Sequence, residues 1–333
     1  MILETISAAQ VGLDASDPLP FEFRPGRVVS PLIVSFPHIG LEWPAELGPR
    51  PQVSFPRNAD FAVDRLFPRA EQHGAATLRA RWSRLVVDLN RAADDVDAEL
   101  VPDHPAPRPR ESLSVATVAG ERRPIRNRGV VWRSAIGNIP LLTTLDYAAL
   151  SQRIARYHAP YHRALELLVA RRRQQFGYAI VLDAHSMPGT VAGELVLGTR
   201  SARSCGPEVR AIAVAALSGQ LPALRSIGAW PLALAIDEPY QGGEVAARFG
   251  RPELNVHAIQ LEISRAIYMD EFRLELGAVP DPGEALRPAS RPKVRSAASD
   301  ASRKLAALVA AIDVLLGELA REREDLAGRA AAE

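Results

Sequence analysis

Short apolar runs that end on polar or small residues recur along the chain, a pattern typical of buried strands in an α/β sheet. The central run is residues 178–182, which passes into Asp183-Ala184-His185. Residues 76–89 predict a helix or loop that passes into a further strand. The other predicted strands are residues 27–36, 129–133, 194–197, 232–236 and 256–263.

Apolar positions at helical spacing predict helices between these strands. One long helical stretch, residues 144–176, is expected to be interrupted or kinked at Pro160. Residues 91–114 are rich in Asp and Pro and predict a loop long enough to be a lid or an insertion. The other predicted helices are residues 61–73, 208–217 and 297–326.

Strands that alternate with helices favour an α/β fold with a mixed, mostly parallel central sheet flanked by helices. The length of 333 residues allows one large domain or two small ones. Because no internal repeat is visible, we expect a single α/β domain over residues 1–333. Its last element is expected to be the amphipathic helix at 297–326, which suits packing or oligomer formation.

The composition excludes several classes of protein. Hydrophobic residues make up 47% of the chain, and a net charge of +1 argues against a nucleic acid or a membrane surface as partner. Cys205 is the single cysteine, so any metal must be held by histidine and carboxylate. The first residues lack the features of a signal peptide, so we expect a cytoplasmic protein. The sequence leaves open whether the protein forms a homo-oligomer.

Polar side chains follow several of the predicted strands. In open α/β sheets ligands bind just beyond the carboxyl ends of strands, so these side chains are expected to converge. Asp60 and Asp64 stand four residues apart and would share one face of a helix. The residues at or near strand ends are His38, Asn90, Arg91, His185, Tyr240 and Glu262.

Two histidines and one carboxylate, with a fourth position left for water, form a catalytic zinc arrangement. His38 and His185 are the candidate histidines. Glu262 lies inside an apolar run, which is costly for a core residue without a function, so it is the candidate for proton transfer. Arg91 beside Asn90 suits a substrate carboxylate, because a guanidinium group binds a carboxylate through two hydrogen bonds.

Three further residues each have more than one candidate role. Tyr240 lies in a Gly-rich loop and can donate a hydrogen bond to a developing oxyanion. Arg84 and Arg133 can each polarise a carbonyl or bind a second substrate carboxylate. For all three, a role in holding loops together stays open.

Nine stretches between Ser35 and Glu271 together resemble the N-formylglutamate amidohydrolase family, whose members are also called N-formylglutamate deformylases. Each stretch alone is a weak signal, but their order along the chain is specific. The stretches are SFPHIGLEWP, NADFAVDRLF, SRLVVDLNR, GVVWR, APYHRAL, VLDAHSMP, LGTRSARSC, PYQGGEVAARFGRP and NVHAIQLEISRAIYMDE.

This family is distantly similar to zinc carboxypeptidases and succinylglutamate desuccinylases. The resemblance implies an eight-stranded mixed sheet flanked by helices, and water-mediated hydrolysis of an amide. In the carboxypeptidases a VDLNR stretch supplies an Asn-Arg pair for the terminal carboxylate of the substrate, and Asn90 and Arg91 match it. Their general-base glutamate lies in a late strand, and Glu262 matches it.

One departure from the carboxypeptidase-like pattern concerns the metal. That pattern has a glutamate three residues after the first histidine, and Leu41 stands there in this chain. The carboxylate ligand is therefore expected from Asp64, our preferred residue, or from Asp60. Asp64 can instead pair with an arginine on its own helix, and Asp183 can either orient a histidine ligand or cap its strand.

These observations predict a metal-dependent amidohydrolase with one divalent ion, Zn²⁺, as cofactor. Its partner is expected to be a small-molecule N-acyl amino acid, with N-formyl-L-glutamate as the best guess and formate and L-glutamate as products. One alternative is a deacylase of another N-acyl amino acid or of a peptide-like amide. The departure at Leu41 leaves open a second alternative, a catalytically silent binding protein on the same fold.

Overall fold

The computed structural model describes residues 4–108, 115–118, 121–124, 128–191, 194–227, 233–276 and 297–327. A central sheet of seven strands organises the molecule, in the order β1-β3-β2-β8-β11-β9-β10. These strands are β1 (Phe21–Arg24), β2 (Leu32–Phe36), β3 (Ala76–Ala80), β8 (Ala179–Met187), β9 (Leu195–Gly198), β10 (Leu234–Ile236) and β11 (Val256–Ser264).

The sheet is mixed and mostly parallel, as the sequence predicts. Strands β3, β2, β8 and β11 run parallel to one another, while β1 is antiparallel to β3 and β9 is antiparallel to β11. The described sheet has seven strands, so the expectation of eight is corrected. The small hairpins pair β4 (Val115–Val118) with β5 (Glu121–Pro124), β6 (Ser134–Ala135) with β7 (Ile139–Pro140), and β12 (Met269–Asp270) with β13 (Glu275–Leu276).

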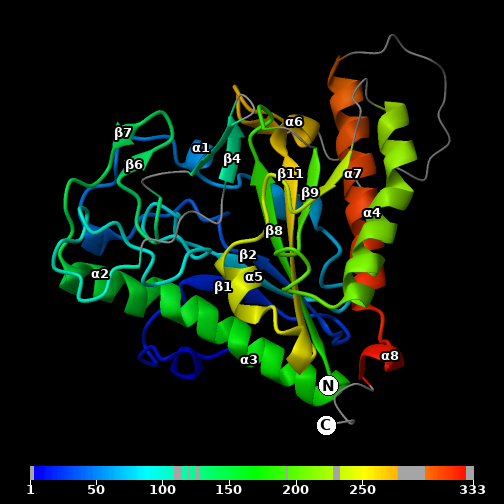
Figure 1. Ribbon diagram of the computed structural model, residues 1–333, viewed down its shortest axis with the longest axis horizontal. Helices are drawn as coiled ribbons and strands as arrows, with labels where there is room; N and C mark the ends of the chain where they lie inside the picture. Colours follow the sequence, from blue (N-terminus) through cyan, green and yellow to red (C-terminus); the bar gives the residue numbers. More distant parts are fainter. Residues whose placement is uncertain are drawn as a thin grey trace.

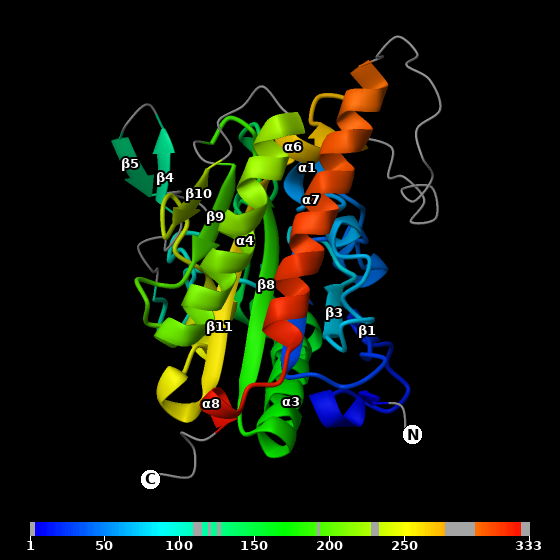
Figure 2. The same cartoon turned by 90° about the vertical axis from the view of Figure 1, so that its right-hand side faces the viewer.

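Helices cover both faces of the sheet (Figures 1 and 2). Helix α3 crosses one face, where its Leu165 and Leu168 pack in one cluster with Val181 of β8. Helices α4 and α7 lie side by side on the other face and enclose a second cluster. The helices are α1 (Phe55–Asn58), α2 (Tyr147–Arg153), α3 (Ala159–Phe176), α4 (Pro207–Ile227), α5 (Glu244–Phe249), α6 (Arg265–Tyr268), α7 (Ala297–Ala320) and α8 (Glu324–Ala327).

Side-chain alternation along the strands separates an apolar face from a polar one. In β8, Ile180, Leu182 and Ala184 join the cluster under α4 and α7. Because successive side chains point to opposite faces, Asp183 and His185 lie on the α3 face with Val181. The α3 face of β8 is therefore apolar at its start and polar toward its carboxyl end.

Strand β11 repeats this pattern beside β8. Its Gln260 pairs in register with Asp183, and its Glu262 pairs with His185. On the other side of β8, Ser35 of β2 pairs with Asp183. Two polar rows thus cross the neighbouring strands near their carboxyl ends, where the sequence predicts a ligand site.

Three predicted elements are wrong in detail. Residues 61–73 form turns and a short 3₁₀ helix, Val63–Leu66, instead of an amphipathic helix. In residues 76–89 the strand comes first, as β3, and the VVDLN portion is a series of turns. Residues 129–133 also lie in turns and an isolated bridge, next to the short strand β6.

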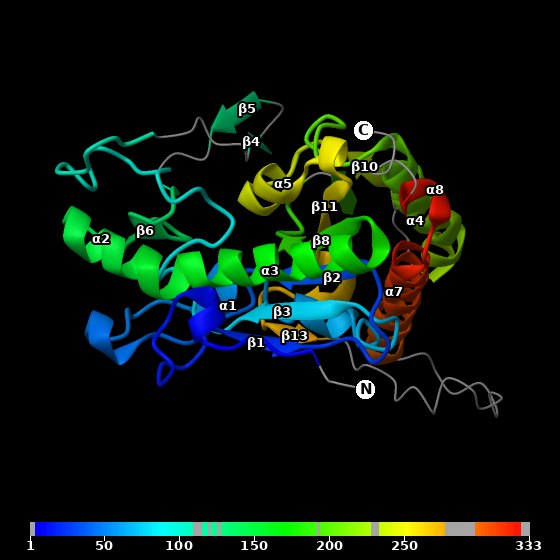
Figure 3. The ribbon, with the colours of Figure 1, turned by 90° about the horizontal axis from the view of Figure 1, so that it is seen from below.

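The long helical stretch 144–176 is present in three parts. Helix α2 passes through a π-helical turn, Ile154–His158, into α3, and Pro160 lies in the first turn of α3, where a proline is tolerated. Figure 3 shows α3 running beneath the strands. The predicted helix 297–326 appears as α7 and α8 with a break between them.

Two further expectations meet the described chain only in part. Residues 91–108 contain no helix or strand, as expected for a loop, while residues 109–114 lie outside the described residues. None of the helices in the described part of the chain is long and apolar enough to cross a membrane.

Candidate metal centre and active-site pocket

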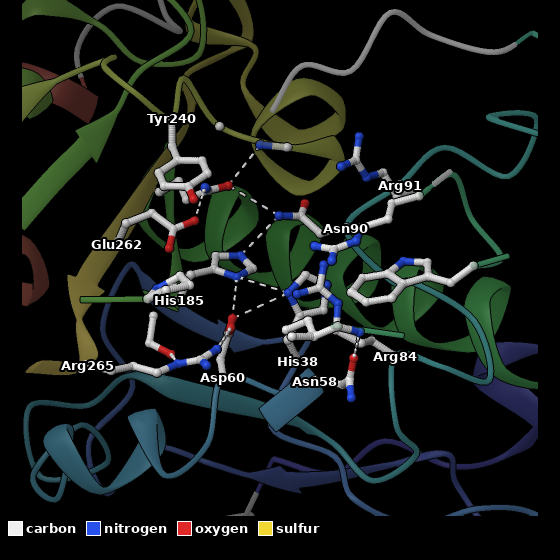
Figure 4. Close-up of a pocket in the computed structure, with 18 of the residues that line it drawn as sticks. His38, Asn58, Asp60, Arg84, Asn90, Arg91, His185, Tyr240, Glu262 and Arg265 are labelled. Atoms are coloured by element: carbon white, nitrogen blue, oxygen red, sulfur yellow. Dashed lines mark hydrogen bonds and ion pairs between the residues drawn. The ribbon is translucent and has the colours of Figure 1, made fainter. Parts of the chain in front are cut away.

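Figure 4 shows the side chains of His38, Asp60 and His185 pointing toward one another in a pocket at the carboxyl ends of β2 and β8. His38 follows β2 directly, and His185 lies near the end of β8. Asp60 lies in the turn after α1, where its backbone N–H donates to the carbonyl oxygen of His38 at 2.9 Å. This backbone hydrogen bond brings the aspartate to the histidines across the gap in sequence.

The three side chains present converging donor atoms. The Nδ1 atoms of His38 and His185 lie 3.1 Å apart, and Asp60 Oδ2 lies 2.8 Å from His185 Nδ1 and 3.4 Å from His38 Nδ1. Ligand atoms at zinc–nitrogen distances of about 2.0–2.1 Å around a tetrahedral ion are separated by about 3.3 Å. Two imidazoles and a carboxylate therefore fit a divalent ion such as zinc, and all three side chains are buried.

Two buried aspartates hold the outer nitrogens of the two rings. Asp88 Oδ1 lies 2.7 Å from His38 Nε2, and Asp183 Oδ2 lies 2.7 Å from His185 Nε2. Because a carboxylate accepts, each Nε2 carries a proton and donates, and each Nδ1 is directed at the centre and at the carboxylate of Asp60. Carboxylates that orient histidine ligands in this way are typical of metal sites.

Charge balance in the pocket keeps the carboxyl group of Asp88 ionised and favours protonation of His185. Burial opposes ionisation of Asp88, but the charges of Arg84 and His38 outweigh it and hold the pKa of that carboxyl well below its usual range. Burial likewise opposes protonation of His185, but Asp183 and Asp60 raise its pKa well above the usual value. The pocket therefore favours positive charge at the place where a cation would bind.

Glu262 lies beside this centre and is held by Gln260. The Gln260 side chain donates from Nε2 to Glu262 Oε1 at 2.9 Å and accepts from the backbone N–H of Gly243 at 2.8 Å. Burial, reinforced by the charge of Asp60, raises the pKa of Glu262 to about 7, against the attraction of His185 and Arg84. A carboxyl group with this pKa can take up and release a proton near neutral pH.

Tyr240 and Asn90 also line the pocket. Tyr240 lies above Glu262 in Figure 4, and burial together with the charge of Glu262 raises the pKa of its hydroxyl, so that it stays protonated. The side chain of Asn90 is already engaged within the protein. Its Oδ1 accepts from the backbone N–H of Val245 at 2.8 Å, and its Nδ2 donates to Gln260 Oε1 at 3.2 Å.

Arg84 and Arg91 line the side of the pocket away from Glu262 (Figure 4). Arg84 donates to Asp88 Oδ2 at 2.6 Å, so it supports the carboxylate that orients His38. Arg91 Nη1 lies 3.8 Å from Asp95 Oδ2. Both positions agree with the sequence expectation of cationic side chains at this site.

Two sequence-based assignments require correction. The carboxylate of Asp64, our preferred metal ligand, binds Arg79 Nη1 at 2.9 Å, and Asp60 is the residue that meets the imidazoles. Without the predicted helix, Asp60 and Asp64 do not share a face. Arg133 pairs with Asp97 at 3.1 Å and does not line the pocket.

Several residues of the site were not recognised as such in the sequence. Asp88 and Gln260 lie within the stretches SRLVVDLNR and NVHAIQLEISRAIYMDE, next to residues with a predicted role. Arg265 Nη2 donates to the carbonyl oxygen of Ala59 at 2.7 Å and so holds the turn that carries Asp60. The alternation of polar and apolar residues in QLEIS was a signal that could have identified Gln260 beside Glu262. Other pocket residues without a predicted role are Asn58, Arg128, Trp132, Ile136, Ser186, Pro188, Gln241, Gly242 and Gly243.

A mixed α/β sheet whose strand ends present two imidazoles, an aspartate and a buried glutamate defines a hydrolase-type pocket. The sequence model of the N-formylglutamate amidohydrolase family matches residues 30–269. The chain belongs to this family, and the chain is an amidohydrolase, an enzyme that acts on a linear amide C–N bond. The resemblance and the class of enzyme that the sequence predicts are thereby confirmed, and the silent-binding alternative loses its support.

Individual relatives agree with this assignment. The N-formylglutamate deformylase of Pseudomonas aeruginosa is 32% identical over 261 residues, which cover 75% of this chain and 85% of the relative. The enzyme of the same name from Pseudomonas putida is 28% identical over 267 residues, with 75% and 85% covered. The crystal structure of N-formylglutamate amidohydrolase from Ralstonia eutropha aligns with a TM-score of 0.65 at 26% identity, over 89% of this chain and 99% of that one.

Proposed function

We propose that this enzyme hydrolyses N-formyl-L-glutamate to formate and L-glutamate with the help of a divalent cation, zinc by preference, held by His38, Asp60 and His185. The observation that carries this proposal is the convergence of three metal-type donors within 4.8 Å of one another, beside a buried glutamate. The names of the two Pseudomonas relatives support the choice of substrate.

A cation bound by these three residues would acidify water and polarise the formyl carbonyl. Asp88 and Asp183 contribute by fixing both rings with Nδ1 directed inward, which requires no rearrangement on binding. Arg265 contributes by holding Ala59, next to Asp60, through the hydrogen bond to its carbonyl oxygen.

Glu262 moves the proton in this proposal. Its carboxylate accepts a proton from the attacking water as the new C–O bond forms at the formyl carbon. It then delivers that proton to the amide nitrogen as the C–N bond breaks, which gives formate and the free amine. Gln260 keeps Oε1 of Glu262 in place for both steps through its hydrogen bond at 2.9 Å.

Arg91 is the proposed anchor for the carboxylate next to the scissile amide. Asn90 lines the same region, but because its amide is bonded to Gln260 and Val245, its main contribution is to fix the chain from which Arg91 projects. Tyr240, protonated and on the Glu262 side of the pocket, is placed to donate to the developing oxyanion.

The choice of acyl group depends on the shape of the pocket, so a deacylase of another N-acyl amino acid is the alternative to test. We expect metal-loaded protein to hydrolyse N-formyl-L-glutamate faster than the N-acetyl and N-succinyl analogues. A clear preference for either analogue would overturn the assignment of the formyl group.

The same assay tests the proton transfer. The Glu262→Gln variant is expected to lose about 10²- to 10⁴-fold in kcat while its metal content stays unchanged. Glu166→Gln is the matched control, since Glu166 pairs with Arg248 on the exposed side of α3 and should leave kcat as it is. Full activity of Glu262→Gln would show that Glu262 is not the base. Hydrolysis by protein that holds no divalent metal would show that the reaction does not need the proposed cation.

A further inference from the structure

Among the described residues, four arginines line the pocket: Arg84, Arg91, Arg128 and Arg265. Three of them lie near a carboxylate of the protein. Arg84 is 2.6 Å from Asp88, Arg265 is 3.6 Å from Asp60, and Arg91 is 3.8 Å from Asp95.

Arg128 differs from the other three. Within the described residues its guanidinium makes no ion pair, and its contact is with the ring of Trp132, 4.5 Å from the ring centroid. Its backbone also forms an isolated bridge with Trp132. The charge of Arg128 is therefore the one in this group that the described protein does not neutralise.

Trp132 gives Arg128 a fixed position. The indole Nε1 donates to Asp88 Oδ2 at 3.1 Å, and the ring is almost fully buried. The guanidinium of Arg84 lies 4.6 Å from the centroid of the same ring. Trp132 thus ties Arg128 to the residues that support His38, and a guanidinium held on an aromatic ring loses little conformational freedom when it binds an anion.

Among the described residues, positive charge outweighs negative charge around Arg128. Partial burial and the charges of Arg84 and Arg91 outweigh the opposing charge of Asp88 and lower the pKa of Arg128 to about 10, so the guanidinium stays charged at neutral pH beside two other cations. An incoming carboxylate would relieve this repulsion and form charge-assisted hydrogen bonds in a partly desolvated place.

We propose that Arg128 binds the side-chain carboxylate of the substrate and so selects dicarboxylic N-formyl amino acids over neutral ones. This inference rests on the proposed function, in which Arg91 holds the carboxylate next to the amide. A dicarboxylate then uses two of the cations that line the pocket, Arg91 and Arg128. Arg133, which the sequence suggested for a second carboxylate, is already paired with Asp97 and Glu99.

The test compares N-formyl-L-glutamate with N-formyl-L-glutamine, which has the same length but a neutral side chain. The metal-loaded wild-type enzyme should favour the glutamate derivative by about 100-fold in kcat/KM. The Arg128→Met variant should lose most of this preference while its kcat/KM for N-formyl-L-glutamine changes little. The preference is the ratio of the two kcat/KM values measured on one protein preparation. A lower fraction of folded protein reduces both values equally and leaves the ratio unchanged.

Arg133→Met is the matched control and should keep the wild-type ratio. A second measurement, calorimetric binding of L-glutamate and L-glutamine to the same holoenzymes, does not depend on turnover. If wild type hydrolyses no N-formyl amino acid, the proposed function fails, and the binding preference still decides the role of Arg128. The inference would be overturned if the wild type had equal kcat/KM values and equal affinities for the acidic and neutral compounds. It would also be overturned if Arg128→Met kept the wild-type preference.

Discussion

The Nδ1 atoms of His38 and His185 face each other at 3.1 Å, and the opposite nitrogen of each ring contacts its own buried aspartate. Two lone pairs directed at each other repel unless a proton or a cation lies between them. The sheet and the turn after β2 nevertheless hold both rings in this orientation. The fold therefore holds both rings in position before a cation binds. The two aspartates orient the rings and belong to the centre as much as the histidines do.

The first prediction concerns Asp88, which orients His38 and accepts from both Arg84 and Trp132. Replacing it by Asn removes the charge that fixes the Nε2 proton of His38. Metal affinity should fall by about 10- to 100-fold, as measured by competition with a chromophoric chelator. The variant should also unfold at lower denaturant concentration, because Arg84 loses its partner.

A matched control for this variant exists elsewhere on the molecule. Asp313 lies 2.7 Å from His73 Nε2, the same type of contact as Asp88 with His38, but away from the pocket. Asp313→Asn should leave metal affinity unchanged. Equal metal affinities of Asp88→Asn and the wild type would show that the carboxylate does not support the centre.

The second prediction separates the two aspartates that the sequence offered. Asp60→Asn should abolish stoichiometric metal binding, because Asp60 supplies the single carboxylate of the group. Asp64→Asn should keep the metal and cost about 1 kcal/mol of stability, because Arg79 still has Glu71 within 3.3 Å. Elemental analysis of the dialysed proteins measures the difference, and loss of metal from Asp64→Asn would restore the original assignment.

The choice of Asp64 failed for a physical reason. The apolar positions of residues 61–73 have helical spacing, but the chain folds there into turns, with Ala62 in a left-handed conformation at φ 60°. The hydrogen bond from Asp60 N–H to the His38 carbonyl, between distant residues, decides which aspartate meets the histidines. Local spacing carries no information about such a tertiary contact.

The residues on regular strands were easier to predict. His185 and Glu262 lie on β8 and β11, where a period of two fixes the face that each side chain takes, and the two are adjacent in register. Arg128 and Trp132 lie in irregular chain, and their roles come from contacts with Arg84 and Asp88. The sequence therefore identified the histidines and the glutamate of the site better than the residues proposed to bind the substrate.

The third prediction concerns the close approach of Gly243 to Asn90. A Cβ atom at Gly243 would lie 2.5 Å from the Asn90 side-chain amide, so the amide must move. Since Asn90 contacts Gln260, which holds Glu262, Gly243→Ala should lower kcat/KM by about 100-fold, as a misplacement of about 1 Å can do.

Gly219 provides the control for this variant, because it lies in α4 with open space around its Cβ position. Gly219→Ala should leave kcat/KM unchanged and raise stability by about 0.5–1 kcal/mol through helix propensity. Unaltered kinetics of Gly243→Ala would mean that the contact is not needed for the position of Asn90.

Two buried histidines hold the chain on either side of Asn90. His162 Nε2 donates to the carbonyl oxygen of Leu89 at 2.9 Å, and His158 Nε2 donates to that of Arg91 at 2.8 Å. Burial lowers the pKa of His158 to about 4 and that of His162 well below its usual range. Both rings are therefore neutral in the folded protein near pH 6, while they take up protons in the unfolded chain below about pH 6.5.

The fourth prediction follows from this difference in proton uptake. The contribution of these two histidines to the free energy of unfolding is complete above about pH 6.5 and falls as the pH drops toward 4, by up to about 1.4 kcal/mol per pH unit for each, because the unfolded state binds the protons. Urea denaturation of chelator-treated protein between pH 7.5 and 5 measures the slope, and in the double variant His158→Gln, His162→Gln stability should gain less from each unit of rising pH than it does in the wild type. Leu165→Ala, which removes a buried side chain of α3, should lower stability by about 2–5 kcal/mol at every pH and keep the wild-type slope. A double variant whose slope equals that of wild type would show that these imidazoles take up protons equally in both states.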